Sequence, residues 1–489
     1  MNWRFSYLLF IIFLLAACSK DPPIYTEEAL NGYPEEVGKI MLTQCAIPGC
    51  HNDKSYDAAG GLNLTSWEKM FEGSRNNAAV IPYSSEQSFL LFFVNTFDEL
   101  GPSLTPLMPF NSDTLTKEEV ILISDWIAAG AANDEGFVKF SDNPSRSKFY
   151  VANQGCDLVS IFDAETGLIM RSVETGSPTA IESPHMVRVS PDGNYWYVVF
   201  FSGNMFQRYD AATDAFIDEV DIGNGSWNTF TISSDGKTAY AVNWNADGSV
   251  AVVDLENMQL LEKYQGSGLL EWPHGSTLSS DGKTLYLTAQ TGNFIYKIDV
   301  TDINSPEFEK VVLETGQVPN PLSSLDPHEI VFTPNESKYF VTCQKSNEVR
   351  VFQTSNDSLV DIIPTGTFPQ EFAISITTNY LFVSCTEDTI SFPGTRGSVA
   401  VIDWQNNTFV KSINTGFQPH GIAVDEAKQL VYVAHRNIDS KGPAPHHTTD
   451  CGGRNGFVRI IDMNTLNVIS SYKAEVSVDA YSVAVRNKK

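Results

Sequence analysis

Most of the chain consists of short segments in which apolar and polar residues alternate, separated by turn residues. From Phe149 onward these segments recur in units of roughly 40 to 55 residues, a spacing typical of propellers and solenoids. Alternation with a period of two predicts half-buried β-strands, and each unit holds about four of them. Turn clusters at 190–193, 233–236 and 279–282 combine serine, aspartate and glycine, and they predict tight connections between successive strands.

The units share an aromatic residue followed by an aliphatic one near the end of one strand. Seven such units of about four strands favour a seven-bladed β-propeller over a sandwich. The first unit lacks an obvious innermost strand, whereas the C-terminal residues 481–485 predict one strand that belongs to no other unit. We therefore expect this last strand to close the ring, with 137–140 as the alternative. The shared pairs are Tyr150-Val151, Tyr197-Val198, Tyr240-Ala241, Tyr286-Leu287, Phe340-Val341, Phe382-Val383 and Tyr432-Val433.

This repeated pattern resembles the YVTN family of seven-bladed propellers, whose motif reads Tyr150-Val151-Ala152-Asn153 here. An aspartate follows the next strand in six of the units, and Gln353 replaces it once. The resemblance implies an all-β propeller over 137–489.

A different pattern precedes the propeller. Residues 34–43 predict a short helix, and loop-rich sequence with several glycines and prolines follows it. Thr116 and Glu119 have the spacing of a capping box, and the apolar residues after them recur on one face of a final helix. We therefore expect a multidomain protein, in which a small all-α domain over 33–134 is followed by the all-β propeller.

The helical segment contains two cysteines, the second of which is followed directly by a histidine. Cys45-Ala46-Ile47-Pro48-Gly49-Cys50-His51 resembles the attachment motif of c-type haem, in which two thiols form thioethers and the histidine ligates iron. The motif departs from the common form by having four residues between the cysteines instead of two. The alternatives are a disulfide between Cys45 and Cys50, or half of a zinc site.

The order of the pieces in 33–134 resembles the small cytochrome c domains of extracytoplasmic proteins, including the planctomycete-type group. In that group a methionine before a proline, shortly upstream of the last helix, is the second axial ligand. The resemblance implies one covalent haem c, with Met108 opposite His51 and the iron acting as an electron relay. Met41 and Met70 are the rival methionines, and we expect both to be packing residues.

Histidines recur at one position in the propeller, directly after the proline that begins an innermost strand. Since neighbouring strands of a blade run in opposite directions, the start of each innermost strand and the end of the second strand of the same blade lie on one face of the ring. The arrangement has two interpretations: a site for a second metal or a redox substrate, or a common way of starting a strand. Cys343 and Cys385 match one another in neighbouring blades, and we expect them to lie too far apart for a disulfide. The candidate histidines are His185, His274, His328 and His420 at strand starts, and His435 at a strand end.

The first residues have the architecture of a secretion signal. An apolar run from Tyr7 to Leu15 is too short for an ordinary transmembrane helix, and small residues follow it. The sequence up to Cys18 resembles the lipobox of bacterial lipoproteins, which implies a signal peptide over 1–17, lipidation of Cys18 and a polar tether over 18–32. We therefore expect a lipid anchor in the outer membrane of a bacterial envelope, on its periplasmic side or at the cell surface.

Charge narrows the choice of partners. With 59 acidic and 32 basic residues, the formal net charge of −27 repels phosphate backbones, which excludes nucleic acid as a partner. The leading hypothesis is an electron-transfer protein that meets a redox partner protein or a small redox molecule. The alternatives are an oxidoreductase with a metal or substrate site among the propeller histidines, and a propeller that serves as a binding module for a surface partner.

Overall fold

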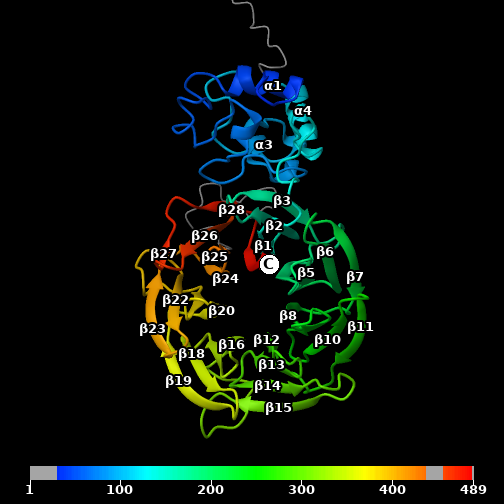
Figure 1. Ribbon diagram of the computed structural model, residues 1–489, viewed down its shortest axis with the longest axis vertical. Coiled ribbons are helices and arrows are strands. Elements are labelled where there is room, and N and C mark those ends of the chain that lie inside the picture. The colour runs from blue at the N-terminus through cyan, green and yellow to red at the C-terminus, as the bar shows by residue number, and fades with distance from the viewer. Residues whose placement is uncertain (1–29, 437–454, 487–489) are drawn as a thin grey trace, which may run out of the picture.

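The computed structural model describes residues 30–436 and 455–486 as a ring of seven β-sheets with a helical segment at its rim (Figure 1). The ring confirms the seven-bladed propeller predicted from the repeat. Each blade is an antiparallel sheet in which the innermost strand lines the ring and the outermost strand faces solvent. The first strands of a blade are mostly buried, whereas the outermost ones, such as β7, are largely exposed. No helix within the described residues is long and apolar enough to cross a membrane.

Blades two to four follow one another in chain order. Their strands are β4 (Pro184–Val189), β5 (Tyr195–Phe200), β6 (Met205–Asp210) and β7 (Phe216–Asp221); β8 (Trp227–Ile232), β9 (Thr238–Asn243), β10 (Ser249–Asp254) and β11 (Gln259–Tyr264); and β12 (Pro273–Leu278), β13 (Thr284–Ala289), β14 (Phe294–Asp299) and β15 (Glu307–Val312).

Blades five to seven continue the ring. Their strands are β16 (Pro327–Phe332), β17 (Lys338–Cys343), β18 (Glu348–Gln353) and β19 (Ser358–Pro364); β20 (Pro369–Ile374), β21 (Tyr380–Cys385), β22 (Ser398–Asp403) and β23 (Thr408–Ile413); and β24 (Pro419–Asp425), β25 (Leu430–His435), β26 (Gly456–Asp462), β27 (Asn467–Val468) and β28 (Ala474–Val476), the last of which pairs with β26.

Blade one combines the two ends of the propeller. The C-terminal strand β29 (Ala480–Arg486) takes its innermost place and pairs with β1 (Lys148–Asn153), and β2 (Leu158–Asp163) and β3 (Ile169–Glu174) complete the sheet. Residues 137–140 form no strand. Because β29 also contacts both neighbouring innermost strands, β24 and β4, the ring of inner strands is continuous.

The segment before the propeller is helical only in short pieces, and loops join them. Its longest helix has 12 residues, and it begins with the expected capping box between Thr116 and Glu119. Glycine and proline interrupt the rest of the chain, so the segment is less helical than the expected all-α domain. Its helices are α1 (Glu35–Ile40), the π-helix η2 (Met41–Cys45), α2 (Trp67–Met70), the 3₁₀-helix η3 (Ser85–Gln87), α3 (Phe89–Val94), the 3₁₀-helix η4 (Asp98–Leu100) and α4 (Lys117–Ala128).

The helical segment is packed firmly against the propeller. One hydrophobic cluster runs from Tyr33 and Ile127 in this segment to Tyr150 and Trp196 in blades one and two. Asn77 adds a polar contact to the turn between β2 and β3: its Nδ2 donates to the Gly167 carbonyl at 2.8 Å, and its Oδ1 accepts from the Ile169 N–H at 2.7 Å.

We predict that Asn77→Ala weakens this junction. Asn77 is 4% exposed, and its removal leaves the buried Ile169 N–H without a partner, whereas the Gly167 carbonyl still accepts from the Tyr472 hydroxyl. The free energy of unfolding should fall by about 2 kcal/mol. Chemical denaturation followed by intrinsic fluorescence measures the change. The exposed Asn304→Ala serves as the control and should leave stability unchanged; equal stability of the two variants would contradict the contact.

Candidate functional sites

A cavity of about 360 Å³ lies inside the helical segment, and its walls are mainly apolar. Both motif cysteines, the histidine after them and the methionine expected as its counterpart line this same cavity. They come from two parts of the sequence, the end of η2 with the loop after it and the proline-rich loop before α4. The four residues are Cys45, Cys50, His51 and Met108.

His51 is oriented by the backbone around it. Its Nδ1 lies 3.1 Å from the Leu62 carbonyl oxygen, and its own carbonyl accepts from the Leu64 N–H at 2.9 Å. Since a carbonyl oxygen only accepts, Nδ1 carries the proton and Nε2 remains available as a ligand. Burial lowers the pKa of His51, which favours the neutral imidazole that metals bind.

Both motif thiols are free. Cys45 is the last residue of η2 and is buried in the cavity wall, and burial raises the pKa of its thiol to about 12. Cys50 is only partly buried, and its N–H donates to the Ile47 carbonyl at 3.1 Å in a tight turn. The turn lets two cysteines separated by four residues reach one cavity.

The three candidate methionines differ in position. Met108 is held by a hydrogen bond from its N–H to the Phe93 carbonyl at 2.8 Å, and it lines the cavity. Met41 and Met70 are at most 1% exposed within the hydrophobic core, and neither is among the residues that line this cavity.

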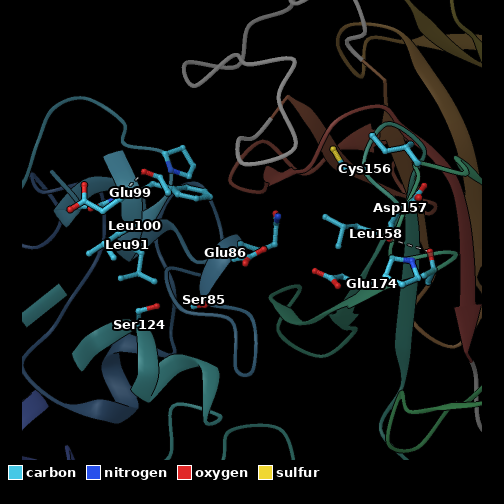
Figure 2. Close-up of a pocket in the computed structure, with 18 of the residues that line it drawn as sticks. Ser85, Glu86, Leu91, Glu99, Leu100, Ser124, Cys156, Asp157, Leu158 and Glu174 are labelled. Atoms are coloured by element: carbon cyan, nitrogen blue, oxygen red, sulfur yellow. Dashed lines mark hydrogen bonds between the residues drawn. The ribbon is translucent and has the colours of Figure 1, made fainter. Parts of the chain in front are cut away.

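A second, larger cavity of about 1190 Å³ lies between the helical segment and blade one. Figure 2 shows carboxylates on both of its sides, with Glu86 and Glu99 on the helical segment and Asp157 and Glu174 on the propeller. The helix α3 separates the two cavities, since Leu91 and Phe92 line the larger one and their helix neighbours line the smaller one. This position agrees with the uniformly apolar sequence of α3, in which every residue except Phe93 is buried.

Four of the candidate propeller histidines meet inside the ring of inner strands. Each is the second residue of an innermost strand, and all are at most 7% exposed. The His274 and His328 rings are 3.9 Å apart between centroids, His328 and His420 are 6.1 Å apart, and Tyr481 contacts both His420 at 3.8 Å and His185 at 3.9 Å.

Three of these rings are fixed by the neighbouring blade. Nδ1 of His185 lies 2.7 Å from the Asn228 carbonyl, that of His274 lies 3.2 Å from the His328 carbonyl, and that of His420 lies 3.0 Å from the Tyr481 carbonyl. Burial lowers the pKa of all four histidines, to about 4 for His274, so the group is neutral.

Two glutamates that the sequence reasoning missed lie beside these histidines. Glu329 and Glu371 are the third residues of β16 and β20, one position after His328 and Gln370. Burial raises the pKa of both carboxyls, Glu329 raises that of Glu371 further, and the Arg188 guanidinium lowers both. The shared register Pro-X-Glu in two successive blades was a signal that could have revealed them.

The remaining candidates lie elsewhere. His435 ends β25, and its ring stacks on Phe457 at 4.2 Å between centroids. Each of the other four histidines contacts another of the group or Tyr481, and His185 also stacks on Phe201 at 5.3 Å. Cys343 and Cys385 are free and fully buried, as expected for thiols in neighbouring blades. Cys18, with the expected signal and lipidation site, lies outside the described residues.

Comparison with known proteins supports the fold. The family model described as "Lactonase, 7-bladed beta-propeller" matches residues 205–372, which lie in blades two to six. The protein is also similar to Antigen Lp49 of Leptospira interrogans serogroup Icterohaemorrhagiae serovar copenhageni (strain Fiocruz L1-130), with 24% identity over 305 residues. That match covers 61% of this chain and 64% of the relative, so the chain spans less than two thirds of that protein's length.

Two solved structures share the ring. A protein of unknown function from Desulfotomaculum acetoxidans DSM 771 has a TM-score of 0.53 at 14% identity, and a candidate 6-phosphogluconolactonase from Bacteroides uniformis ATCC 8492 has a TM-score of 0.51 at 17% identity. Each match covers 70% of this chain and 99% of the other. At such identities the likeness establishes only the fold, a seven-bladed propeller.

We predict that His435 makes stability depend on pH. Burial lowers its pKa in the folded protein to about 3, against an ordinary value of 6.5 in the unfolded chain. Between these values the unfolded chain binds the proton and the folded protein does not. The contribution is therefore complete above pH 6.5 and is lost as the pH falls toward 3, by about 2 kcal/mol between pH 7 and pH 5.

Denaturation of wild type and His435→Asn at pH 7 and pH 5 measures this contribution, and the variant should lose about 2 kcal/mol less on acidification. Cys385→Ala is the control, because Cys385 takes the same place in its blade and the pKa of its thiol is raised to about 12. An equal loss in wild type and His435→Asn would show that His435 does not titrate as expected.

Proposed function

We propose that this protein is an electron-transfer lipoprotein of the bacterial envelope, with one haem c in the cavity of the helical segment. Cys45 and Cys50 are the attachment points, and His51 and Met108 are the axial ligands. The observation that carries the proposal is that these four residues, recognised in the sequence as a haem motif and its methionine, line one apolar cavity.

The composition of the cavity wall fits a porphyrin. Alanine, leucine, phenylalanine, valine, proline and methionine side chains form most of the wall, as suits a flat apolar ring system. Gln44 and Asn76 are among its few polar residues. Helix α3 contributes part of this apolar wall, and the loops that contain Gly60 and Pro109 contribute the rest.

The alternatives for the two cysteines have less support. Cys45 and Cys50 do not form a disulfide. Within the described residues, the one group of three side chains close enough to hold a metal ion lies in the propeller and includes neither cysteine, which argues against zinc.

A bound haem with histidine and methionine ligands supplies one-electron transfer and leaves no position open for substrate. The chain's own residues position the ligands. The Leu62 carbonyl fixes the tautomer of His51, and the Phe93 carbonyl positions Met108. Helix α3 excludes water from one side of the haem cavity. The partner in this proposal is a redox protein or a small redox molecule, and the propeller is either a binding module or part of a second redox site. The lipid anchor at Cys18 and the outer-membrane location rest on the sequence alone.

The first test concerns covalent attachment. Full-length protein made in a cytochrome-maturing periplasm should keep its haem after denaturation, because thioethers survive unfolding. The double variant Cys45→Ala, Cys50→Ala should lose it, as measured by haem-stained denaturing gels and intact mass. The matched control Cys343→Ala, Cys385→Ala removes two free thiols from the propeller and should keep the haem. Wild-type protein without covalent haem would refute the proposal.

The second test concerns the axial methionine. Ferric haem with a sulfur ligand has a weak near-infrared charge-transfer band, and Met108→Ala should abolish this band while the haem stays attached. Met41→Leu and Met70→Leu are the controls and should leave the band unchanged. If the band persists in Met108→Ala, a different side chain ligates the iron.

A further inference from the structure

We propose that the propeller holds a divalent transition-metal ion between His328, Glu371 and His420, on the inner strands of blades five, six and seven. One ligand atom from each side chain lies within 4.8 Å of the other two. A tetrahedral zinc ion keeps its ligand atoms about 3.3 Å apart, so each side chain needs to move by less than about 1 Å to bind it. The site is separate from the haem cavity and uses none of its residues.

The histidines have nitrogens with no other partner. Nδ1 of His420 is hydrogen-bonded to the Tyr481 carbonyl. Nε2 of His420 is buried and has no hydrogen-bond partner among the described residues. Nδ1 of His328 is also buried without such a partner, and it lies 4.0 Å from the Glu371 carboxylate. A buried polar atom without a partner is energetically unfavourable, so these two nitrogens are available to a ligand.

The neighbours of the triad resemble the outer shell of a metal site. A backbone carbonyl fixes the tautomer of His420, as outer-shell acceptors do for histidine ligands. Thr288 donates to the His328 carbonyl at 2.8 Å, and Thr342 donates to the Gln370 carbonyl at 2.9 Å, so the inner strands that carry the ligands are tied across blades. The Glu371 side chain is only 13% exposed, so the whole group lies largely out of solvent.

Two buried carboxyl groups, Glu329 and Glu371, lie near the single guanidinium of Arg188. A divalent cation bound there would compensate the cost of ionising carboxyl groups at this depth. The nearby Arg436 is already paired with Asp479, at 2.6 and 2.9 Å. Two imidazoles and a carboxylate are the donor set of several zinc and non-haem iron sites, and such a set has room for further ligands.

The test is a zinc titration of the full-length, haem-loaded protein. After treatment with EDTA and dialysis, isothermal titration with ZnCl₂ should give one bound Zn²⁺ per chain. Glu371→Gln and His420→Gln should each weaken the binding at least tenfold. The control His435→Asn removes a buried histidine outside the triad and should bind zinc as wild type does. Absence of stoichiometric binding, or equal binding by folded triad variants, would overturn the site.

A second measurement does not depend on the variants. X-ray absorption at the zinc edge of the wild-type complex should show imidazole nitrogen and carboxylate oxygen around the ion. A spectrum with sulfur in the first shell would place the zinc at cysteines and overturn the proposal. Circular dichroism of each variant, compared with wild type, establishes that it is folded before its affinity is interpreted.

Discussion

The pairing of β29 with β1 is the contact on which the rest of the structure depends. It supplies the innermost strand of blade one from the other end of the propeller, so that seven inner strands face one another around a closed ring. The same strand brings Tyr481 between His420 and His185. Closure therefore does more than protect sheet edges, because it sets all seven inner strands at one level and brings side chains of equal register together.

Register explains what the sequence could and could not predict. The repeat predicted the seven blades and the inner strands of blades two to seven, and it left two candidates, 481–485 and 137–140, for the inner strand of blade one. Glu371 was missed because it lies one position after the strand register that the histidines occupy. A glutamate there looks like an ordinary solvent-facing residue when its neighbours in other blades are unknown. His435 was grouped with the others by face alone, but its ring stacks on Phe457, a neighbour that only packing reveals.

In the helical segment, short-range sequence signals predicted local structure, whereas the positions of the elements relative to the propeller could not be predicted from the sequence. The capping box of α4 follows from Thr116 and Glu119, because its bonds span only three residues. The position of α3 between two cavities depends on blade one, far away in the sequence, and an apolar hexapeptide alone does not reveal it. Likewise, Asn77 has no visible role until the turn between β2 and β3 is placed against it.

The shared hydrophobic cluster also bears on how such a chain can evolve. Because the apolar residues of the helical segment and of blades one and two bury one another, separating them would expose contiguous apolar surface on both pieces. We therefore expect the helical segment and its adjoining blades to be inherited as one unit.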